Sequence, residues 1–337
     1  MRADDISMVT KKLYDGSEPF LSVYPDFDMN SLPLWVVDNI DNARVYGNSK
    51  KGIILADGRK FHLDNHLNDM TGKEWTFFIN SVFSTHYPTN GKESYAHHIR
   101  KIHPTPKPPQ LMRDLIYFFT KRRELVFDSF MGVGGTLLGA ALADRTAAGI
   151  ELNQKYIDAY IEAAKELELE VFKTKCGDAL ALLKDNSVMQ KLTDGKPISL
   201  LLIDPPYSNM MSREKTGADI AVYGKKSTPF TASDLDLGNM NRVLFLSKLK
   251  ESIELTIPYL KYRGYVVVFI KDLQPHKKET NLLHYEVVEA LNKIPNLYYK
   301  GMKIWADEST KLYPYGYPFS FVANQIHQYI LIFRKEK

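Results

Sequence analysis

Short apolar runs alternate with helix-patterned segments through most of the chain. Runs of strand length lie at 125–128, 147–151, 171–174, 199–203 and 264–270, followed by two closing strands at 297–305 and 328–333. Helical spacing of apolar residues marks 110–121, 137–143, 153–167, 181–192, 242–260 and 282–291. Strands that alternate with helices form parallel sheets, because each crossover helix returns the chain to the same edge. The pattern therefore predicts an α/β fold with a mostly parallel, seven-stranded sheet and helices on both faces.

The first hundred residues follow a different pattern. Asp57-Gly58 lies between two strand-like runs at 52–56 and 59–63, which is a strong hairpin signal. The stretch from Lys73 to Phe83 predicts another strand or a turn onto the main body. These features suggest a region that is organised separately from the main sheet.

The strand predicted at 199–203 stops at Asp204, Pro205, Pro206 and Tyr207. Two consecutive prolines cannot continue a hydrogen-bonded ladder, so the chain must turn there. Open α/β sheets bind ligands at the carboxyl ends of their strands. The turn therefore predicts an active-site edge that presents the Asp204 carboxylate, the Pro205 carbonyl and the Tyr207 ring, while a strand-end cap is the structural alternative for Asp204.

A glycine-rich turn follows the strand that ends at Asp128. Gly132 and Gly134 precede a helix, and such turns let the backbone approach a ligand at a helix N-terminus. Leu137 stands where a dinucleotide-binding motif requires its third glycine, and the Gly-Lys-Ser/Thr of a phosphate loop is absent. The turn predicts a nucleotide-like ligand without a pyrophosphate, with close packing as the alternative use of the glycines.

The next two strands also end near carboxylates. Glu151 follows the glycines by about 20 residues, where an acid accepts hydrogen bonds from ribose hydroxyls. Asp178 could accept from an adenine amino group, and it could also cap the helix that follows it. Asp128 and Glu151 together favour a ligand with a positive centre. S-adenosylmethionine has an ammonium, a sulfonium and a ribose diol.

Composition narrows the class of protein. The 337 residues are 44% apolar and 25% charged, which is ordinary for a globular protein. The single cysteine, Cys176, excludes a disulfide framework and a cysteine-based zinc site. Residues 1–19 lack the apolar core of a signal peptide, and no run approaches the ~20 apolar residues of a membrane span. We expect a soluble, cytoplasmic protein with no membrane partner.

The net charge and the histidines give weaker evidence about function than the strand ends do. The net charge of +4 is too small to indicate a polyanion by itself. His97, His98 and His103 share a short segment, but the prolines from Pro104 onward impose extended backbone and no carboxylate or cysteine shares a helical face with the histidines. We therefore expect no metal site, and a basic loop that faces phosphate or ligand instead.

Three motifs together resemble amino-group DNA methyltransferases that use S-adenosylmethionine. Residues 128–136 resemble the family's Phe-x-Gly-x-Gly cofactor motif, residues 204–207 its catalytic Asp-Pro-Pro-Tyr, and residues 103–108 its His-Pro-Thr-x-Lys-Pro segment. The resemblance covers about residues 95–333 and implies the Rossmann-like class I methyltransferase fold. It implies catalytic roles for Asp204, Pro205, Pro206 and Tyr207, and cofactor-binding roles for Asp128, Phe130, Gly132, Gly134, Thr136, Glu151, Asp178 and Lys107.

The chemistry that this resemblance implies uses a base flipped out of double-stranded DNA. Tyr207 would stack on the base, while Asp204 and the Pro205 carbonyl would accept the two N–H bonds of the exocyclic amine. Asp before Pro-Pro-Tyr favours adenine N6 as the target. Cytosine N4, an RNA base, or a catalytically silent nucleic-acid-binding module are the alternatives, and Leu137 weakens a nicotinamide-dependent oxidoreductase.

The chain departs from the related β group in motif order, because its cofactor motif precedes its catalytic motif. The chain is thus expected to be circularly permuted relative to that group. We expect residues 1–94 to form an N-terminal extension that contributes to target recognition, helped by loops at 208–241 and 271–281, and residues 95–337 to form the catalytic domain. The resemblance also leaves open a homodimer and a cognate restriction nuclease as partners.

Overall fold

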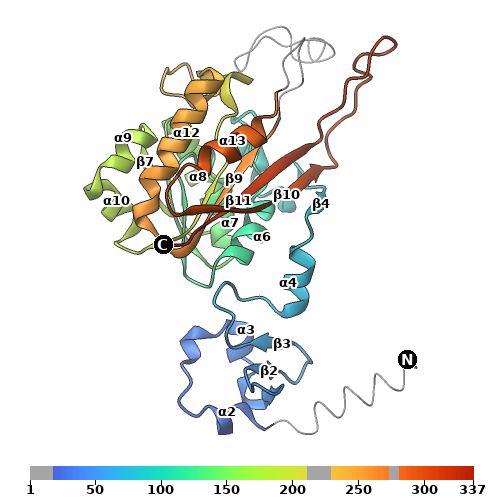
Figure 1. The fold of residues 1–337 in the computed structure, drawn as a ribbon, viewed down its shortest axis with the longest axis vertical. Coiled ribbons are helices and arrows are strands. Elements are labelled where there is room, and N and C mark those ends of the chain that lie inside the picture. The colour runs from blue at the N-terminus through green and yellow to red at the C-terminus, as the bar shows by residue number, and fades with distance from the viewer. Residues whose placement is uncertain (1–17, 211–228, 273–280) are drawn as a thin grey trace. The chain divides into compact units, whose positions relative to one another are not determined.

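The computed structural model describes residues 18–210, 229–272 and 281–337 (Figure 1). The chain divides into two compact units, one of Met1–Asn80 with Tyr117–Arg122 and one of Ser81–Ile116 with Arg123–Lys337. The boundary expected at residue 94 stays a prediction. The loops expected at 208–241 and 271–281 lie partly outside the described residues.

The first unit contains a small three-stranded sheet. Its strands β1 (Arg44–Tyr46), β2 (Gly52–Ile54) and β3 (Lys60–His62) are antiparallel in the order β1-β2-β3. Asp57-Gly58 forms the turn between β2 and β3, which confirms the predicted hairpin, and Gly58 adopts φ +85°. The short helices α2 (Phe20–Val23) and α3 (Leu34–Val37) and the 3₁₀ turns η1 (Met29–Ser31) and η2 (Ile40–Asn42) complete the unit around a core that includes Phe20, Val36, Ile53 and Phe61.

The stretch from Lys73 to Phe83, expected to be a strand or a turn, is mostly a helix, α4 (Gly72–Phe78). Thr71 caps it: the Thr71 side chain accepts from the Glu74 amide, and the Glu74 carboxylate accepts from the Thr71 amide. This capping box satisfies free donors of the first turn, so it favours helix where the aromatic residues alone suggested strand. A strand follows only at β4 (Val82–Thr85).

The second unit is built on an eight-stranded sheet in the order β4-β10-β11-β9-β8-β5-β6-β7. Its other strands are β5 (Leu125–Asp128), β6 (Thr146–Glu151), β7 (Lys173–Cys176), β8 (Ile198–Ile203), β9 (Leu260–Ile270), β10 (Leu297–Asp307) and β11 (His327–Lys335). The prediction of seven strands was wrong by one, because β4 pairs in parallel with the edge of β10. The ladder of Val82–Thr85 with Ile304–Asp307 is four residues long, which is too short to recognise as a sheet strand from sequence.

Helices cover both faces of this sheet, and alternate residues along each strand point to opposite faces. The Phe127 and Leu201 side chains pack in a core with α9 (Ala179–Lys184), α10 (Asn186–Thr193), α12 (Arg242–Thr256) and α13 (Leu283–Leu291). The other helices are the short α5 (His97–Arg100), α6 (Pro109–Phe119), α7 (Gly135–Leu142) and α8 (Gln154–Glu166). The predicted helix over 181–192 is two helices, since Asp185 ends α9 and caps α10.

The order of the strands creates a ligand-binding edge. Strands β6 and β7 extend from one side of β5, while β8 and β9 extend from the other, and all of these neighbours are parallel. The order reverses between β5 and β8, and such a switch point opens a crevice beyond the carboxyl ends of the strands. Because β11 runs antiparallel to β9 and β10, its first residues lie at this same edge.

Candidate active site

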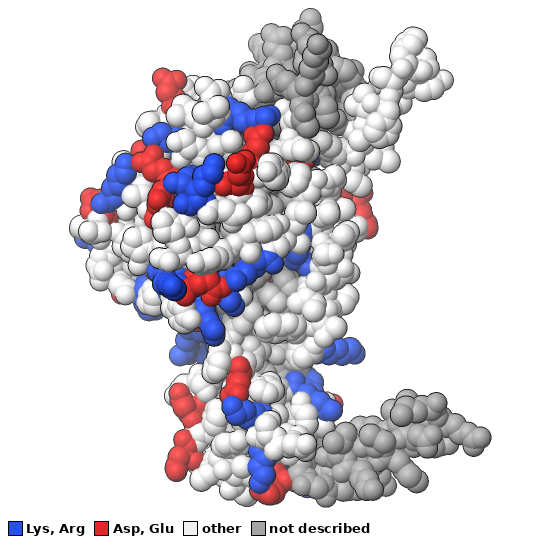
Figure 2. All heavy atoms as spheres, viewed as in Figure 1, with Lys and Arg blue, Asp and Glu red and all other residues white. Residues whose placement is uncertain are grey.

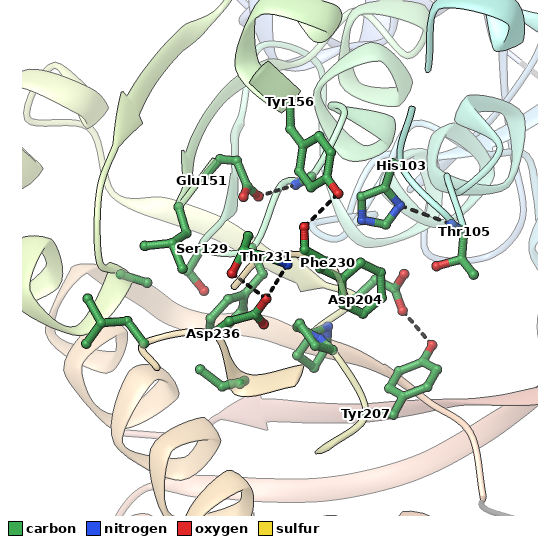
Figure 3. A pocket seen from close by; sticks show the side chains of 18 of the residues that line it. His103, Thr105, Ser129, Glu151, Tyr156, Asp204, Tyr207, Phe230, Thr231 and Asp236 are labelled. Carbon is green, nitrogen blue, oxygen red and sulfur yellow. Dashed lines mark hydrogen bonds between the residues drawn. The ribbon is translucent and has the colours of Figure 1, made fainter. Parts of the chain in front are cut away.

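A cavity opens at the carboxyl edge, beside the switch point (Figure 3). The residues of the sequence prediction that line it are Lys107, Phe130, Gly132, Glu151, Asp178, Asp204, Pro205, Pro206 and Tyr207. Asp128 and Thr136 are buried beside it and line an adjoining hollow together with Gly132. Of the twelve predicted residues, only Gly134 lines neither space.

Glu151 holds the glycine-rich turn at the end of β6. One carboxylate oxygen accepts from the Gly132 amide at 2.8 Å, and the other accepts from the Asn153 amide at 2.9 Å. Each oxygen keeps a further lone pair that can accept a hydroxyl from the cavity. Burial raises the pKa of Glu151 to about 7, although the backbone hydrogen bonds oppose that rise.

Asp128 and Ser129 lie where β5 ends and the turn begins. Asp128 accepts from the Phe130 amide at 2.9 Å, and burial raises the pKa of its carboxyl to about 7. The Ser129 hydroxyl is buried and has no hydrogen-bond partner among the described residues, yet Ser129 lines the cavity. A buried polar atom without a partner is unfavourable, and a polar ligand in the cavity would relieve it.

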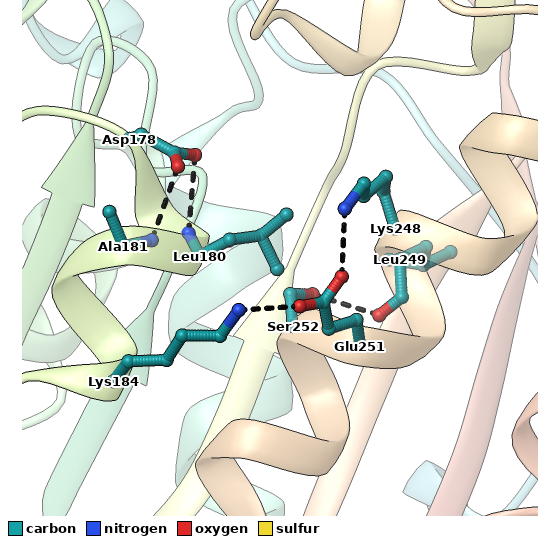
Figure 4. A network of polar contacts seen from close by, with 8 residues as sticks. All are labelled: Asp178, Leu180, Ala181, Lys184, Lys248, Leu249, Glu251 and Ser252. Carbon is teal, nitrogen blue, oxygen red and sulfur yellow. Dashed lines mark hydrogen bonds and ion pairs between the residues drawn. The ribbon is translucent and has the colours of Figure 1, made fainter.

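Asp178 caps helix α9, which was the structural alternative for this residue. Its two carboxylate oxygens accept from the Leu180 and Ala181 amides, both at 3.2 Å (Figure 4). Helix α9 is in turn tied to α12, since Lys184 pairs with Glu251 at 2.8 Å. Asp178 also lines the cavity, so capping and ligand contact are compatible.

The two glycines of the turn have different reasons to be glycine. Both adopt positive φ, +50° at Gly132 and +73° at Gly134. A Cβ on Gly134 would lie 2.2 Å from the Tyr160 ring, whereas one on Gly132 would meet the His103 side chain at 3.4 Å. Gly134 therefore serves close packing against α8, and Gly132 faces the cavity.

Lys107, Asp204 and Tyr207 form a buried polar cluster at the end of β8. The Lys107 ammonium pairs with Asp204 Oδ2 at 2.7 Å and donates to the Tyr207 hydroxyl at 3.4 Å. The Lys107 and Asp204 side chains are 8% and 17% exposed, so this ion pair is largely shielded from water. The structure thus places Lys107 against the predicted catalytic acid.

The Tyr207 hydroxyl has one proton and two acceptors. It lies 2.5 Å from Asp204 Oδ1 and 3.1 Å from Gln328 Oε1, so it can donate to either oxygen. Burial raises the pKa of Tyr207 well above its ordinary value, and this keeps the proton on the hydroxyl. Gln328 reaches the site because β11 starts at the carboxyl edge.

The segment that carries Lys107 is held by buried basic residues. The Arg100 guanidinium is 1% exposed and donates to the backbone carbonyls of Val133 and Lys107. His103 lies between the Tyr156 and Phe230 rings, with centroids 4.9 and 5.0 Å away. Burial lowers the pKa of His103 to about 3, so its ring is neutral. The segment from His97 to Lys107 thus serves mostly to hold Lys107 in position.

Sequence reasoning missed the segment that follows residue 229. Phe230, Thr231 and Asp236 line the cavity, and Tyr156 donates to the Phe230 carbonyl at 3.0 Å. Asp236 fixes this segment by accepting from the Thr231 amide at 3.0 Å and the Gly238 amide at 2.8 Å. The long irregular stretch around these residues was a signal for a functional loop, but nothing in it identified which residues face the site.

Neither a metal centre nor a membrane span is found in the part of the chain that the structure describes. That part contains no group of three His, Cys, Asp or Glu residues placed to hold a metal ion. It also contains no helix that is both long and apolar enough to cross a bilayer.

Residues 39–163 match the family model described as DNA methylase (N6_N4_Mtase). The matched range contains His103–Pro108 and the glycine-rich turn, and it ends before Asp204. The chain is 28% identical over 144 residues to the Type II methyltransferase M1.MboII of Moraxella bovis, covering 43% of this chain and 50% of that protein. It is 30% identical over 104 residues to the tRNA (guanine(10)-N2)-dimethyltransferase of Pyrococcus abyssi, covering 31% of this chain and 29% of that protein. The chain thus spans half or less of these relatives.

Two solved structures have a similar arrangement of elements. TrmN from Thermus thermophilus is 14% identical, with a TM-score of 0.44, and the match covers 72% of this chain and 53% of that one. An rRNA methylase from Streptococcus thermophilus is 11% identical, with a TM-score of 0.40 and coverage of 69% and 99%. The matched family model and the Moraxella relative each match less than half of this chain.

Proposed function

We propose that the protein transfers a methyl group from S-adenosylmethionine to the exocyclic amine of a DNA base, and that the base is adenine, methylated at N6. The observation that carries the proposal is that Asp204 and Pro205 line the same cavity as Phe130, Glu151 and Asp178. This supports a nucleoside site and an acceptor site for an amine within one cavity.

The residues fit the cofactor. Glu151 is available to accept from ribose hydroxyls, and the Ser129 hydroxyl lacks a partner among the described residues. Phe130 and Leu180 line the cavity and can contact an adenine ring. Gly132 leaves room for a ligand against the backbone of the turn. When bound, S-adenosylmethionine supplies an electrophilic methyl group on a positively charged sulfur, which suits a site lined with carboxylates.

Asp204 and Pro205 would orient the target. An exocyclic amine is a weak nucleophile because its lone pair is conjugated with the ring. If the Asp204 carboxylate and the Pro205 carbonyl accept its two N–H bonds, the nitrogen lone pair is directed away from both oxygens. In the described structure the Tyr207 hydroxyl is bound to Asp204 Oδ1, so an incoming amine must displace it. Gln328 is the second acceptor to which that hydroxyl can turn.

Lys107 would hold Asp204 in place. Its ammonium group lies 2.7 Å from Oδ2, so it occupies that oxygen and leaves Oδ1 toward the amine. Asp204 then contributes hydrogen-bond acceptance while positive charge develops on the amine.

The identity of the methylated base, and whether the substrate is DNA or RNA, is tested by identifying the methylated nucleosides. Double-stranded DNA is incubated with the protein and isotope-labelled S-adenosylmethionine, and the nucleosides are separated by mass spectrometry. We expect labelled N6-methyladenine. N4-methylcytosine would leave the mechanism in place and correct the base. Label only in 5-methylcytosine, or only in an RNA substrate, would contradict the proposal.

The role of Asp204 is tested in the same assay. Asp204→Asn keeps the size of the side chain but removes its charge, and we expect at least about a hundred-fold loss of turnover with duplex affinity retained. Full activity in this variant would contradict the assigned role.

A further inference from the structure

Strands β10 and β11 are joined by an aromatic arm, which we define as residues 308–326. Backbone and side-chain contacts hold its two segments side by side: the Asp307 amide donates to the Ile326 carbonyl at 3.0 Å, and Asn324 exchanges two hydrogen bonds of 2.8 Å with the backbone of Tyr313. Figure 1 shows the arm as a narrow extension beyond the ends of the two strands.

The outer part of the arm is aromatic at every second residue. The five aromatic residues are Tyr313, Tyr315, Tyr317, Phe319 and Phe321. Tyr317, Phe319 and Phe321 are 81%, 93% and 93% exposed. No Lys, Arg, Asp or Glu occurs between 312 and 326, and this tip is white in Figure 2. Large exposed apolar groups gathered in this way mark a binding surface.

The arm and the cavity belong to the same edge of the sheet. The residues of β10 next to Asp307 are hydrogen-bonded to β11, and Gln328, one residue into β11, contacts Tyr207 in the cavity. The arm therefore leaves the protein from the place where the proposed target base must enter. A polymer that delivers one base into the cavity extends past its mouth on both sides.

We infer that the aromatic arm binds the target duplex and inserts aromatic rings between its bases next to the flipped nucleotide. This inference rests on the proposed function, since it requires a duplex at the cavity. Flipping a base leaves a gap in the stack, and apolar side chains that enter between base steps replace the lost stacking. Exposed Phe and Tyr rings suit the faces of any base.

Shape and charge favour a duplex over a protein partner. The two segments of the arm lie side by side without forming strands, and together they are about as wide as the two-stranded ribbon that the major groove accepts. The tip presents only a few side chains, whereas a stable protein interface buries about 800 Å² on each partner. The lack of cations on the tip indicates contact with bases, because contact with phosphates would use Lys or Arg.

The experiment compares Phe319→Ala/Phe321→Ala with the unaltered protein. Affinity is measured on a pool of short random-sequence duplexes over a range of salt concentrations. We expect affinity to fall by about ten-fold or more, because each ring lost removes a stacking contact. The slope of log affinity against log salt concentration should stay the same, because no phosphate contact is removed. Phe319→Tyr/Phe321→Tyr, which keeps both rings, should restore binding.

Two controls distinguish stacking by the arm from a general loss of exposed aromatic surface or of folded protein. Tyr262→Ala removes an exposed ring near the start of β9, at the opposite edge of the sheet, and should leave affinity unchanged. Binding of S-adenosylhomocysteine by calorimetry should be the same in all variants. Unchanged duplex affinity in Phe319→Ala/Phe321→Ala, a changed salt slope, or a shift in oligomeric state by sedimentation would overturn the inference. If the unaltered protein methylates DNA and the arm variant still binds fully, the arm inference alone fails; if it methylates no DNA, the proposed function fails.

Discussion

At the scale of single residues, the role of Asp204 depends on the side chains that contact it. The Lys107 ammonium lies 2.7 Å from Asp204 Oδ2 and engages that oxygen, which leaves Oδ1 to accept from another donor. Sequence motifs brought both residues to attention, yet assigned Lys107 to the cofactor. The distance between them could not be deduced from sequence, because the two residues are far apart in the chain and their contact depends on how α6 and β8 are placed.

Lys107→Met should lower turnover by roughly 10- to 100-fold while the KM for S-adenosylmethionine changes little, because the lost contact is with Asp204. Added to Asp204→Asn, the same substitution should cause no further loss, since it acts only through that carboxylate. Steady-state kinetics on the four proteins measures this cycle. Additive losses, or a raised KM with turnover kept, would return Lys107 to the cofactor-binding role.

Glu151 gives the folded protein a dependence on pH. Burial raises the pKa of this acid from 4.5 to about 7, so between these values the folded state holds a proton that the unfolded state has released. Stability therefore falls as pH rises through that window. Glu151→Gln should remove this part of the decline, up to about 3 kcal/mol, in urea unfolding followed at both ends of the window. An equal decline in both proteins would show that Glu151 is ionised throughout.

At the scale of elements, the glycine-rich turn is fixed by packing as much as by ligand contact. Glu151 ties the turn to β6, Arg100 ties it to the Lys107 segment, and Gly134 lets the Tyr160 ring pack closely against it. A turn restrained on three sides is preformed, so little order has to be imposed on it when a ligand binds.

Gly134→Ala should therefore destabilise the protein by about 2–4 kcal/mol, because its Cβ would overlap the Tyr160 ring in addition to straining a positive φ. Gly58→Ala is the matched control. Gly58 has φ +85° and nothing within 4 Å of the added atom, so only the backbone strain of about 1–2 kcal/mol applies. Thermal or urea unfolding compares the two, and equal losses would mean that the ring moves aside freely.

The elements that could be predicted from sequence are those with strong local signals. Apolar runs gave β5, β6 and β8 within one residue, and the residues that follow the strands gave Asp128, Glu151, Asp178 and Asp204 as a set at one edge. The capping box at Thr71 was a legible signal that was overlooked. β4 and Gln328 could not be found in this way, because each is defined by pairing with a strand far away in the chain.

At the scale of the whole molecule, the chain forms two units with separate cores. Every residue that lines the cavity belongs to the second unit, between His103 and Gln328. Whether the first unit reads the DNA target, as expected from its position in the sequence, stays a prediction. Its basic and acidic residues are nearly balanced, with eight Lys or Arg and nine Asp or Glu over 18–80 and 117–122, so base contacts would have to carry most of such binding.

The antiparallel strand β11 affects how the protein folds during its synthesis on the ribosome. β11 fills the sheet between β9 and β10, and it also supplies Gln328 to the site. Until residues 327–335 have emerged, β9 has an open edge on that side and Tyr207 lacks its second acceptor. Pairing β11 with β9 brings together residues that are far apart in the chain, and such contacts form slowly compared with a helix. If the proposed function holds, the partly synthesised chain would have the proposed cofactor site before the proposed amine site is complete, and activity would require β11.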